Sequence, residues 1–313
     1  MINIIGKRYW FIALSLLLIV PGLIILTTMA IQGRLPLAID YTGGSLLELK
    51  FPEGDLPSTD EVFQIYSQQN IDDVIVQTTD QGSIIIRSTF LEDIQRTAVL
   101  QTMQEQYGAQ VEVLRFENVG PVIGKEVATR AALAVSVAAL IVVIYMTYAF
   151  RGMQHPFRYG ICAIIAMFHD VAIVLSLTAI GSLIFGWQID ALFLTALLTV
   201  IGFSVQDKVV VFDRIRENST IYRKLKFETL VNHSIVQTLQ RSINTQLMTV
   251  EFMLLSLALF GGVTLREFAI ILLVGLLSGT YSSIFTASPI LVIWENKEWK
   301  NWFKPKPKAL EQT

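Results

Sequence analysis

The chain has 313 residues, of which 53% are hydrophobic and 16% are charged. Soluble domains carry about 25% charged residues, so this composition argues against a soluble enzyme. The single cysteine, Cys162, excludes an intrachain disulfide and a cysteine-cluster metal site. A net charge of −2 gives no sign of a nucleic-acid partner, and a polytopic membrane protein is the class that remains.

Six segments have the length and composition of membrane-spanning helices, because a bilayer core about 30 Å thick requires about 20 apolar residues. They are residues 9–31, 131–150, 159–186, 191–212, 247–263 and 268–294. The first follows Lys7 and Arg8, as the apolar core of a signal peptide would. It is longer than the 7–15 residues typical of such a core, so we predict an uncleaved anchor.

The basic residues predict the orientation of these spans, because short cytoplasmic loops retain Lys and Arg. With the N-terminus inside, residues 1–8, 151–158, 213–246 and 295–313 are cytoplasmic and hold 15 basic residues. The short loops on the other side, 187–190 and 264–267, hold only Arg266. We therefore predict that both termini are cytoplasmic and that 295–313 is a basic tail.

Residues 32–130 are then an exported domain, with 15 acidic and 7 basic residues against 11 and 17 in the rest of the chain. Alternating or β-branched patterns predict strands at 46–51, 73–79, 83–88 and 110–116. A capping box at Ser58–Glu61 begins one helix, and a second covers 91–107 and stops at Gly108. The order β-α-β-β-α-β is typical of a ferredoxin-like sandwich, although another small α+β fold fits the same pattern.

The cytoplasmic connector 213–246 mixes basic residues with Ile221, Leu225, Leu230 and Ile235. Two interpretations remain open for it. It is either an amphipathic helix lying on the membrane surface or a solvated basic connector.

Ionisable residues occur inside the predicted spans, where each costs about 2.5–3.5 kcal/mol on insertion scales. His169 and Asp170 lie near the middle of the third span, Asp207 and Lys208 lie in the fourth, and Glu251 lies in the fifth. Facing carboxylates and an imidazole can form a proton relay. The alternatives are an ion-paired helix contact, such as Asp207 with Lys208 or Arg241, and a Lys208 side chain that extends to the cytoplasmic interface.

Other features point to structure rather than chemistry. Gly275, Gly279 and Ser283 form a small-residue face that favours close helix packing, and Pro289 predicts a kink. The charged cluster Asp213, Arg214, Arg216 and Glu217 indicates the end of the fourth span. No metalloprotease, phosphate-loop or serine-hydrolase motif occurs, so we expect no enzymatic activity.

Several motifs resemble the SecF family, whose members pair with SecD in protein export and belong to the resistance-nodulation-division superfamily. They include Ile-Asp-Tyr-Thr-Gly-Gly at 39–44, His-Asp-Val at 169–171 and Val-Val-Val-Phe-Asp-Arg-Ile-Arg-Glu-Asn at 209–218. Further matches lie at 119–124, 238–245 and 261–262. The family motif residues are Asp40, Gly43, Gly44, Asp213, Arg214 and Arg216.

The resemblance implies that the chain is one half of a membrane unit completed by SecD, and that proton flow, or sodium flow, drives late preprotein translocation. It places the ion pathway at Asp207 and Arg241, to which we add His169, Asp170, Lys208 and Glu251. Lys208 and Glu251 depart from the family pattern. No cofactor is implied beyond the coupling ion, H⁺ or Na⁺.

The implied partners are SecD, the SecYEG translocon, YajC, the YidC insertase, the translocating preprotein and membrane lipid, with no nucleic acid. The implied location is the bacterial plasma membrane, or a thylakoid membrane in a cell that has one. Two other functions stay open: a non-conducting assembly factor of a translocase and insertase complex, and a small-molecule exporter of the same superfamily.

Overall fold

The structure is a computed structural model, and it describes residues 3–52, 56–71, 73–79, 82–108, 111–152, 155–246 and 252–301. The chain divides into two compact units. We call Met1–Arg34, Val135–Gly181 and Leu192–Thr313 the bundle unit, and Leu35–Ala134 with Ser182–Ala191 the sheet unit. The predicted basic tail lies mostly outside the described residues, from 302 onward.

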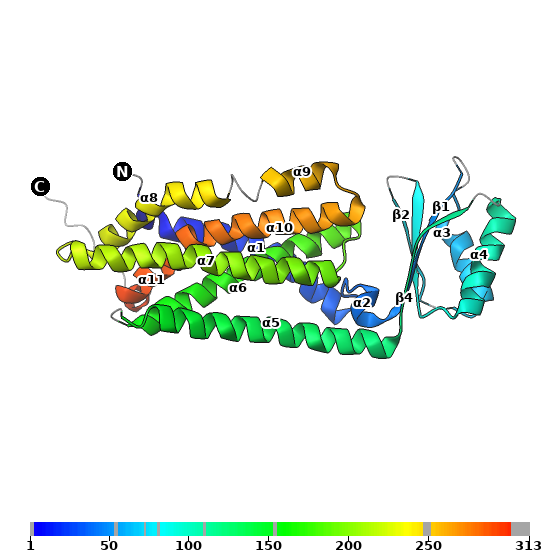
Figure 1. Cartoon of the computed structure of the whole chain (residues 1–313), viewed down its shortest axis with the longest axis horizontal. Helices are drawn as coiled ribbons and strands as arrows, with labels where there is room; N and C mark the ends of the chain where they lie inside the picture. Colours follow the sequence, from blue (N-terminus) through cyan, green and yellow to red (C-terminus); the bar gives the residue numbers. More distant parts are fainter. Residues whose placement is uncertain are drawn as a thin grey trace, which may run out of the picture. The chain divides into compact units, whose positions relative to one another are not determined.

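Helices make up the described part of the bundle unit (Figure 1). They are α1 Arg8–Ile31, α5 Pro121–Ala149, α6 Pro156–Phe185, α7 Ala191–Ile221, α8 Phe227–Gln246, α9 Phe252–Phe260, α10 Val263–Ser282 and α11 Ser288–Glu295. The first part of α5, the last residues of α6 and the first residue of α7 belong to the sheet unit.

Five helical stretches in the described ranges are long and apolar enough to cross a membrane: Ile5–Ile31, Pro121–Ala149, Pro156–Phe185, Ala191–Ile221 and Leu265–Glu295. The predicted span at 247–263 lies partly outside the described residues, since 247–251 are not described, and α9 covers nine residues of the remainder. A sixth span therefore stays a prediction.

The last of these stretches contains an irregular turn close to Pro289. Ser283–Ala287 is π-helical and connects α10 to α11. Proline has no N–H to donate and its ring crowds the carbonyl four residues earlier, here that of Phe285. The wider π turn accommodates this, and the kink predicted at Pro289 stays a prediction.

The N-terminal segment is an integral part of the bundle unit. Ile4 and Ile5 are 3% and 2% exposed, and their backbone N–H groups donate to Asn232 Oδ1 on α8 at 2.8 and 3.2 Å. Arg8 donates to both carboxylate oxygens of Glu298, at 3.1 and 2.7 Å. These contacts place α1 among the folded elements of the bundle unit, and its retention as an anchor stays a prediction.

Most of the predicted connector 213–246 is helical, and part of its apolar surface packs against the bundle core. Helix α7 continues to Ile221, and α8 begins at Phe227. Leu230 and Ile235 are buried against the bundle core, whereas Ile221 and Leu225 are exposed. Tertiary packing of α8 therefore covers half of the apolar side chains that suggested a membrane-surface helix.

In its described residues, the sheet unit forms four strands with two helices between them along the chain, in the predicted order β-α-β-β-α-β. The strands are β1 Gly44–Lys50, β2 Ile75–Thr78, β3 Ser83–Ser88 and β4 Glu112–Val119, and the helices are α3 Thr59–Gln68 and α4 Asp93–Tyr107. All neighbouring strands are antiparallel, in the spatial order β2-β3-β1-β4. Figure 1 shows α3 and α4 on the same face of the sheet.

Local sequence signals explain the helices of this unit. Ser58 Oγ accepts from the Glu61 backbone N–H at 3.3 Å, and Ser58 N donates to Glu61 Oε2 at 2.7 Å, which confirms the capping box. Gly108, with φ of 94°, ends α4 as predicted. The buried side of the sheet includes Leu47 and Ile84, both 0% exposed.

Candidate functional site

A buried ion pair links two helices of the bundle unit. Asp170 on α6 and Lys208 on α7 are both 0% exposed. Lys208 Nζ donates to Asp170 Oδ2 at 2.9 Å and to the backbone oxygen of Ser204 at 3.2 Å. Each charge offsets part of the desolvation cost of the other, which neither could bear alone in an apolar interior.

Three serine hydroxyls complete the surroundings of the Asp170 carboxylate. Ser204 on α7 donates to Oδ2 at 2.5 Å, and Ser278 and Ser282 on α10 donate to Oδ1 and Oδ2, each at 2.7 Å. Ser204 and Lys208 are four residues apart, as are Ser278 and Ser282, so each pair lies on one face of its helix. Three helices thus converge on one carboxylate.

The small-residue face of α10 makes this convergence possible. A Cβ atom at Gly279 would lie 3.2 Å from the Cα of Ser204, and one at Gly275 would overlap the side chain of Val200. The backbones of α10 and α7 therefore approach closely, as small residues permit between membrane helices. At Gly275 and Gly279 this small-residue face packs against α7. Ser283, the third residue predicted for the face, lies in the π turn and donates to Asp207.

His169 lies beside the ion pair. Its Nδ1 is 3.1 Å from Asp170 Oδ1, and its ring stacks on that of Tyr281 with centroids 6.0 Å apart. Its Nε2 is buried and has no hydrogen-bond partner among the described residues. One ring nitrogen therefore faces the carboxylate while the other remains open to a further donor or acceptor.

Asp207 is held by hydroxyl groups rather than by a cation. Ser242 Oγ on α8 donates to Oδ1 at 2.7 Å, and Ser283 Oγ in the π turn donates to Oδ2. Within the described part of the chain, no basic side chain forms an ion pair with this carboxylate, although Asp207 is only 8% exposed. Asp170 and Asp207 thus occupy unlike surroundings, one with an ammonium group and one without.

Three interpretations made from the sequence are corrected or left open by this geometry. Lys208 does not extend to an interface and does not pair with Asp207, because its ammonium group is buried against Asp170. Arg241 on α8 is exposed and forms no ion pair within the described ranges, so the alternative in which it pairs with Asp207 does not hold. Glu251 lies outside the described residues.

The charged cluster near the end of α7 lies within the helix, which continues past it. Arg216 pairs with Asp213, and Arg214 Nη1 donates to Glu217 at 2.5 Å. All four side chains are 34–54% exposed, and exposed pairs of this kind contribute about 0–1 kcal/mol. Arg214 also donates to Gln237 on α8 at 2.7 Å, which helps hold α8 against α7.

The family motif residues Asp40, Gly43 and Gly44 lie in the sheet unit. Asp40 belongs to the four-residue helix α2, Ile39–Thr42, and accepts a hydrogen bond from Ala191 N at 3.0 Å. Gly43 and Gly44 have φ of 74° and 125°, which L side chains rarely adopt. This corner is separate in sequence from the charged residues of the spans.

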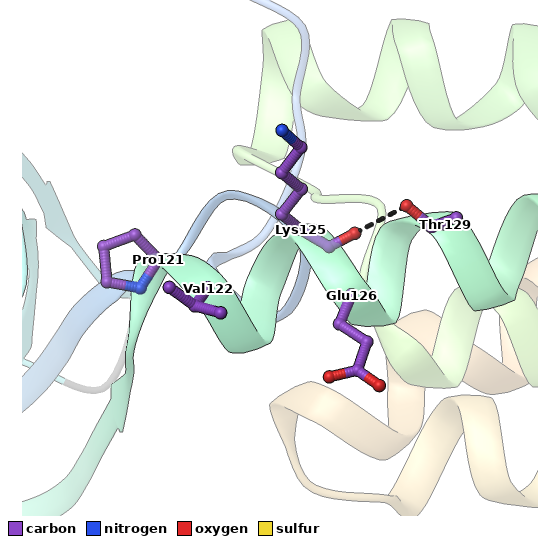
Figure 2. A pocket seen from close by; sticks show the side chains of 5 residues that line it. All are labelled: Pro121, Val122, Lys125, Glu126 and Thr129. Atoms are coloured by element: carbon purple, nitrogen blue, oxygen red, sulfur yellow. Dashed lines mark hydrogen bonds between the residues drawn. The ribbon is translucent and has the colours of Figure 1, made fainter.

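A shallow hollow lies along the first turns of α5 and contains none of the predicted site residues. It is lined by Pro121, Val122, Lys125, Glu126 and Thr129. Figure 2 shows Lys125 and Glu126 pointing to opposite sides of the helix, so no polar groups converge there. Over the described ranges, no group of three or more His, Cys, Asp or Glu side chains could hold a metal ion.

The sequence interpretation missed the serine hydroxyls at positions 204, 242, 278 and 282. A signal for them exists: Ser278 and Ser282 recur at a spacing of four in a strongly apolar segment. A polar pair on one helical face inside a membrane requires a partner on a neighbouring helix. The identity of that partner depends on how the helices are rotated against each other.

The fold and the site define a class: a polytopic membrane protein whose helices enclose a buried ion pair and a second buried carboxylate, with a small sheet unit attached. The family profile described as "Protein export membrane protein SecD/SecF, C-terminal" matches residues 99–297. The protein translocase subunit SecF of Anaerolinea thermophila is 66% identical over 304 residues, which cover 97% of each chain. The chain belongs to the SecF family of protein translocase subunits.

Longer relatives and a solved structure agree with this assignment. The protein translocase subunit SecDF of Bacillus subtilis is 33% identical over 94% of this chain and 38% of its own length. A crystal structure of SecDF from Thermus thermophilus, described as a translocon-associated membrane protein, superposes with a TM-score of 0.79 at 30% identity. That match covers 94% of this chain and 39% of the SecDF chain, so this chain spans about two fifths of the longer proteins.

Proposed function

We propose that this chain couples ion flow through its bundle unit to late stages of preprotein translocation, as an accessory subunit of the Sec export machinery. One observation carries the proposal: the bundle encloses the ion pair of Asp170 and Lys208, together with the carboxylate of Asp207, at depths where charges are costly. Each elementary charge that crosses the membrane supplies about 2.3 kcal/mol per 100 mV, enough to bias a two-state motion.

The energetics favour a coupling role over simple packing. A buried ion pair contributes little net stability, since well-packed apolar residues of the same volume are often as stabilising. Carboxylate, ammonium, imidazole and hydroxyl groups all exchange protons, so H⁺ is the coupling ion that this set of groups suits best, with Na⁺ as the alternative. We propose no covalent catalysis.

A translocation assay in inverted membrane vesicles, with and without a proton-motive force, tests the proposal. Asp207→Asn keeps the side-chain size, removes one titrating group and leaves the ion pair of Asp170 and Lys208 intact. We expect this variant to reach the membrane at normal levels and to lose the stimulation that depends on the proton-motive force. Asp93→Asn is the matched control, because the Asp93 side chain is 91% exposed on α4. Full stimulation by Asp207→Asn would contradict the proposal.

The SecDF relatives support SecD as the partner. In those proteins a segment similar to this chain is continuous with a longer polypeptide, which fits a chain that works beside a separate SecD subunit. The further partners we propose are SecYEG, YajC, the YidC insertase, the preprotein and membrane lipid. Copurification with a second polytopic subunit is the direct check.

We also propose the arrangement of the chain in the bacterial plasma membrane. Both termini are cytoplasmic, residues 32–130 are exported, and the bundle contains six spans. The charge asymmetry of the loops supports this topology. The strand order β2-β3-β1-β4, with both helices on one face, supports a ferredoxin-like sandwich for the exported domain.

A non-conducting assembly factor is the second candidate. The observation that favours it is α5, whose apolar 18-residue window has no buried residue within the chain and is free to contact lipid or a partner helix. An assembly factor would tolerate Asp207→Asn, so the same assay separates the two functions.

A further inference from the structure

We propose that Asp40 is a positioning residue that links the helix carrying the buried charges to the sheet of the sheet unit. The inference rests on the proposed function, because it concerns how movement of α7 reaches the sheet. Its starting point is a hydrogen bond at the first residue of α7, where Ala191 N donates to Asp40 Oδ2 at 3.0 Å.

The carboxylate of Asp40 suits this position physically. The first N–H groups of a helix have no partner inside the helix, and the helix dipole is positive at that end. The neighbouring Tyr41 adds a second contact, since its hydroxyl donates to the backbone oxygen of Asp190 at 2.9 Å. Burial, followed by the nearby charges of Asp40 and Asp190, raises the pKa of Tyr41 to about 12, and a phenol is protonated at neutral pH even at its ordinary pKa, so this hydroxyl is a donor there.

Backbone hydrogen bonds strengthen the same connection. Ile189 N donates to Pro36 O at 2.7 Å, and Ala38 N donates to Ile189 O at 2.9 Å. Leu37 and Ile189 form a parallel bridge between these bonds. Residues 36–41 and 189–191 are therefore joined by at least four hydrogen bonds, two that involve a side chain and two between backbone groups.

The other end of this short segment enters the sheet through Gly43 and Gly44. A Cβ atom at Gly44 would lie 2.6 Å from the backbone oxygen of Ser88 at the end of β3, and one at Gly43 would lie 2.7 Å from the Cα of Pro121. Both glycines also have positive φ, so no other residue fits without a shift. Gly44 is the first residue of β1, which pairs with both β3 and β4.

The same helix that Asp40 contacts carries the buried charges. Helix α7 is continuous from Ala191 to Ile221, and Asp207 and Lys208 lie within it. At 1.5 Å per residue, Asp207 is about 24 Å along the axis from Ala191. A continuous helix moves largely as a rigid rod, so a shift at Asp207 or Lys208 reaches Ala191, and the contact with Asp40 passes it to the segment that enters β1.

The test measures export and ion flux separately, in proteoliposomes that contain this chain with a SecD subunit and the translocon. For Asp40→Ala we expect export driven by the proton-motive force to fall by a factor in the range of about 5–150 that is typical of coupling between two sites. Proton flux through the complex should stay unchanged. Asp40→Asn should recover part of the export, because its amide oxygen can still accept from Ala191 N.

Two controls keep the inference separate from the proposed function. Asp60→Ala removes an exposed carboxylate from the first turn of α3 and should leave both export and flux unchanged. Asp207→Asn should abolish both, and retention of both would overturn the proposed function. Wild-type export by Asp40→Ala, or loss of flux and export together, would overturn the role of Asp40 as a link.

Discussion

Replacing Lys208 by methionine is the most direct way to measure what the buried ion pair contributes. The substitution keeps most of the apolar stem and removes the ammonium group that donates to Asp170 at 2.9 Å. Asp170 then keeps its hydroxyl donors but has lost its opposite charge. Removing one partner of a buried pair costs about 3–5 kcal/mol, and the remaining hydrogen bonds to the carboxylate place our expectation near the lower limit, about 3 kcal/mol.

The measurement is a double-mutant cycle of reversible unfolding in detergent micelles. The four proteins are the wild type, Lys208→Met, Asp170→Asn and the double variant. Each single variant leaves one buried charge unpaired, whereas the double variant leaves none. The double variant should therefore be more stable than the sum of the single effects predicts, with an interaction energy of about 2 kcal/mol, inside the 0.5–3 kcal/mol range of contacting residues.

A matched control and a clear negative outcome complete the experiment. Lys224→Met makes the same chemical change at an exposed lysine between α7 and α8, where we expect less than about 0.5 kcal/mol. If Lys208→Met is no less stable than Lys224→Met, or if the single effects simply add, the pair does not hold the helices as we describe.

Two further predictions use the same unfolding assay. Gly279→Leu should destabilise the bundle by about 1–3 kcal/mol, because a side chain at this position meets the backbone of α7. Gly202→Leu is the control, since a side chain there meets open space and should change the stability little. Equal effects of the two substitutions would contradict the close packing of α10 on α7. Burial raises the pKa of Glu298, but hydrogen bonds that it accepts from Tyr9 and Arg8 outweigh this, and its net pKa lies below the ordinary value. Glu298 therefore stabilises the folded state at pH values above the ordinary glutamate pKa, and this stabilisation is lost as the pH falls through the lowered pKa. The difference in the free energy of unfolding between the wild type and Glu298→Gln should then close in acid. A gap that is independent of pH would rule this out.

Much of the fold could be predicted from local patterns. The capping box at Ser58, the stop at Gly108 and the order of strands and helices in the sheet unit depend on neighbours within a few residues, and the structure contains all of them. Boundaries shifted by a few residues where pairing extends a strand, as in β4, which runs to Val119 because it pairs with β1 as far as Gly44.

The candidate site was only half predictable. Its titratable members were evident because charges are rare in apolar segments, and Asp170, Asp207 and Lys208 are indeed buried. Their partners were not evident, since Asp170 and Lys208 are 38 residues apart and on different helices. The serine donors to Asp170 come from α7 and α10, at positions that are ordinary small polar residues in the sequence.

The sequence by itself determined the class of protein and the family, because hydrophobic segments and motif spacing are local properties. Only the tertiary structure decided that Lys208 pairs with Asp170 and leaves Asp207 to two hydroxyl groups. The physical reason is that helix rotation and close packing, allowed here by Gly279 against Ser204, select which side chains meet. Adjacent residues of one helix point about 100° apart, so neighbours in the sequence acquired different partners in space.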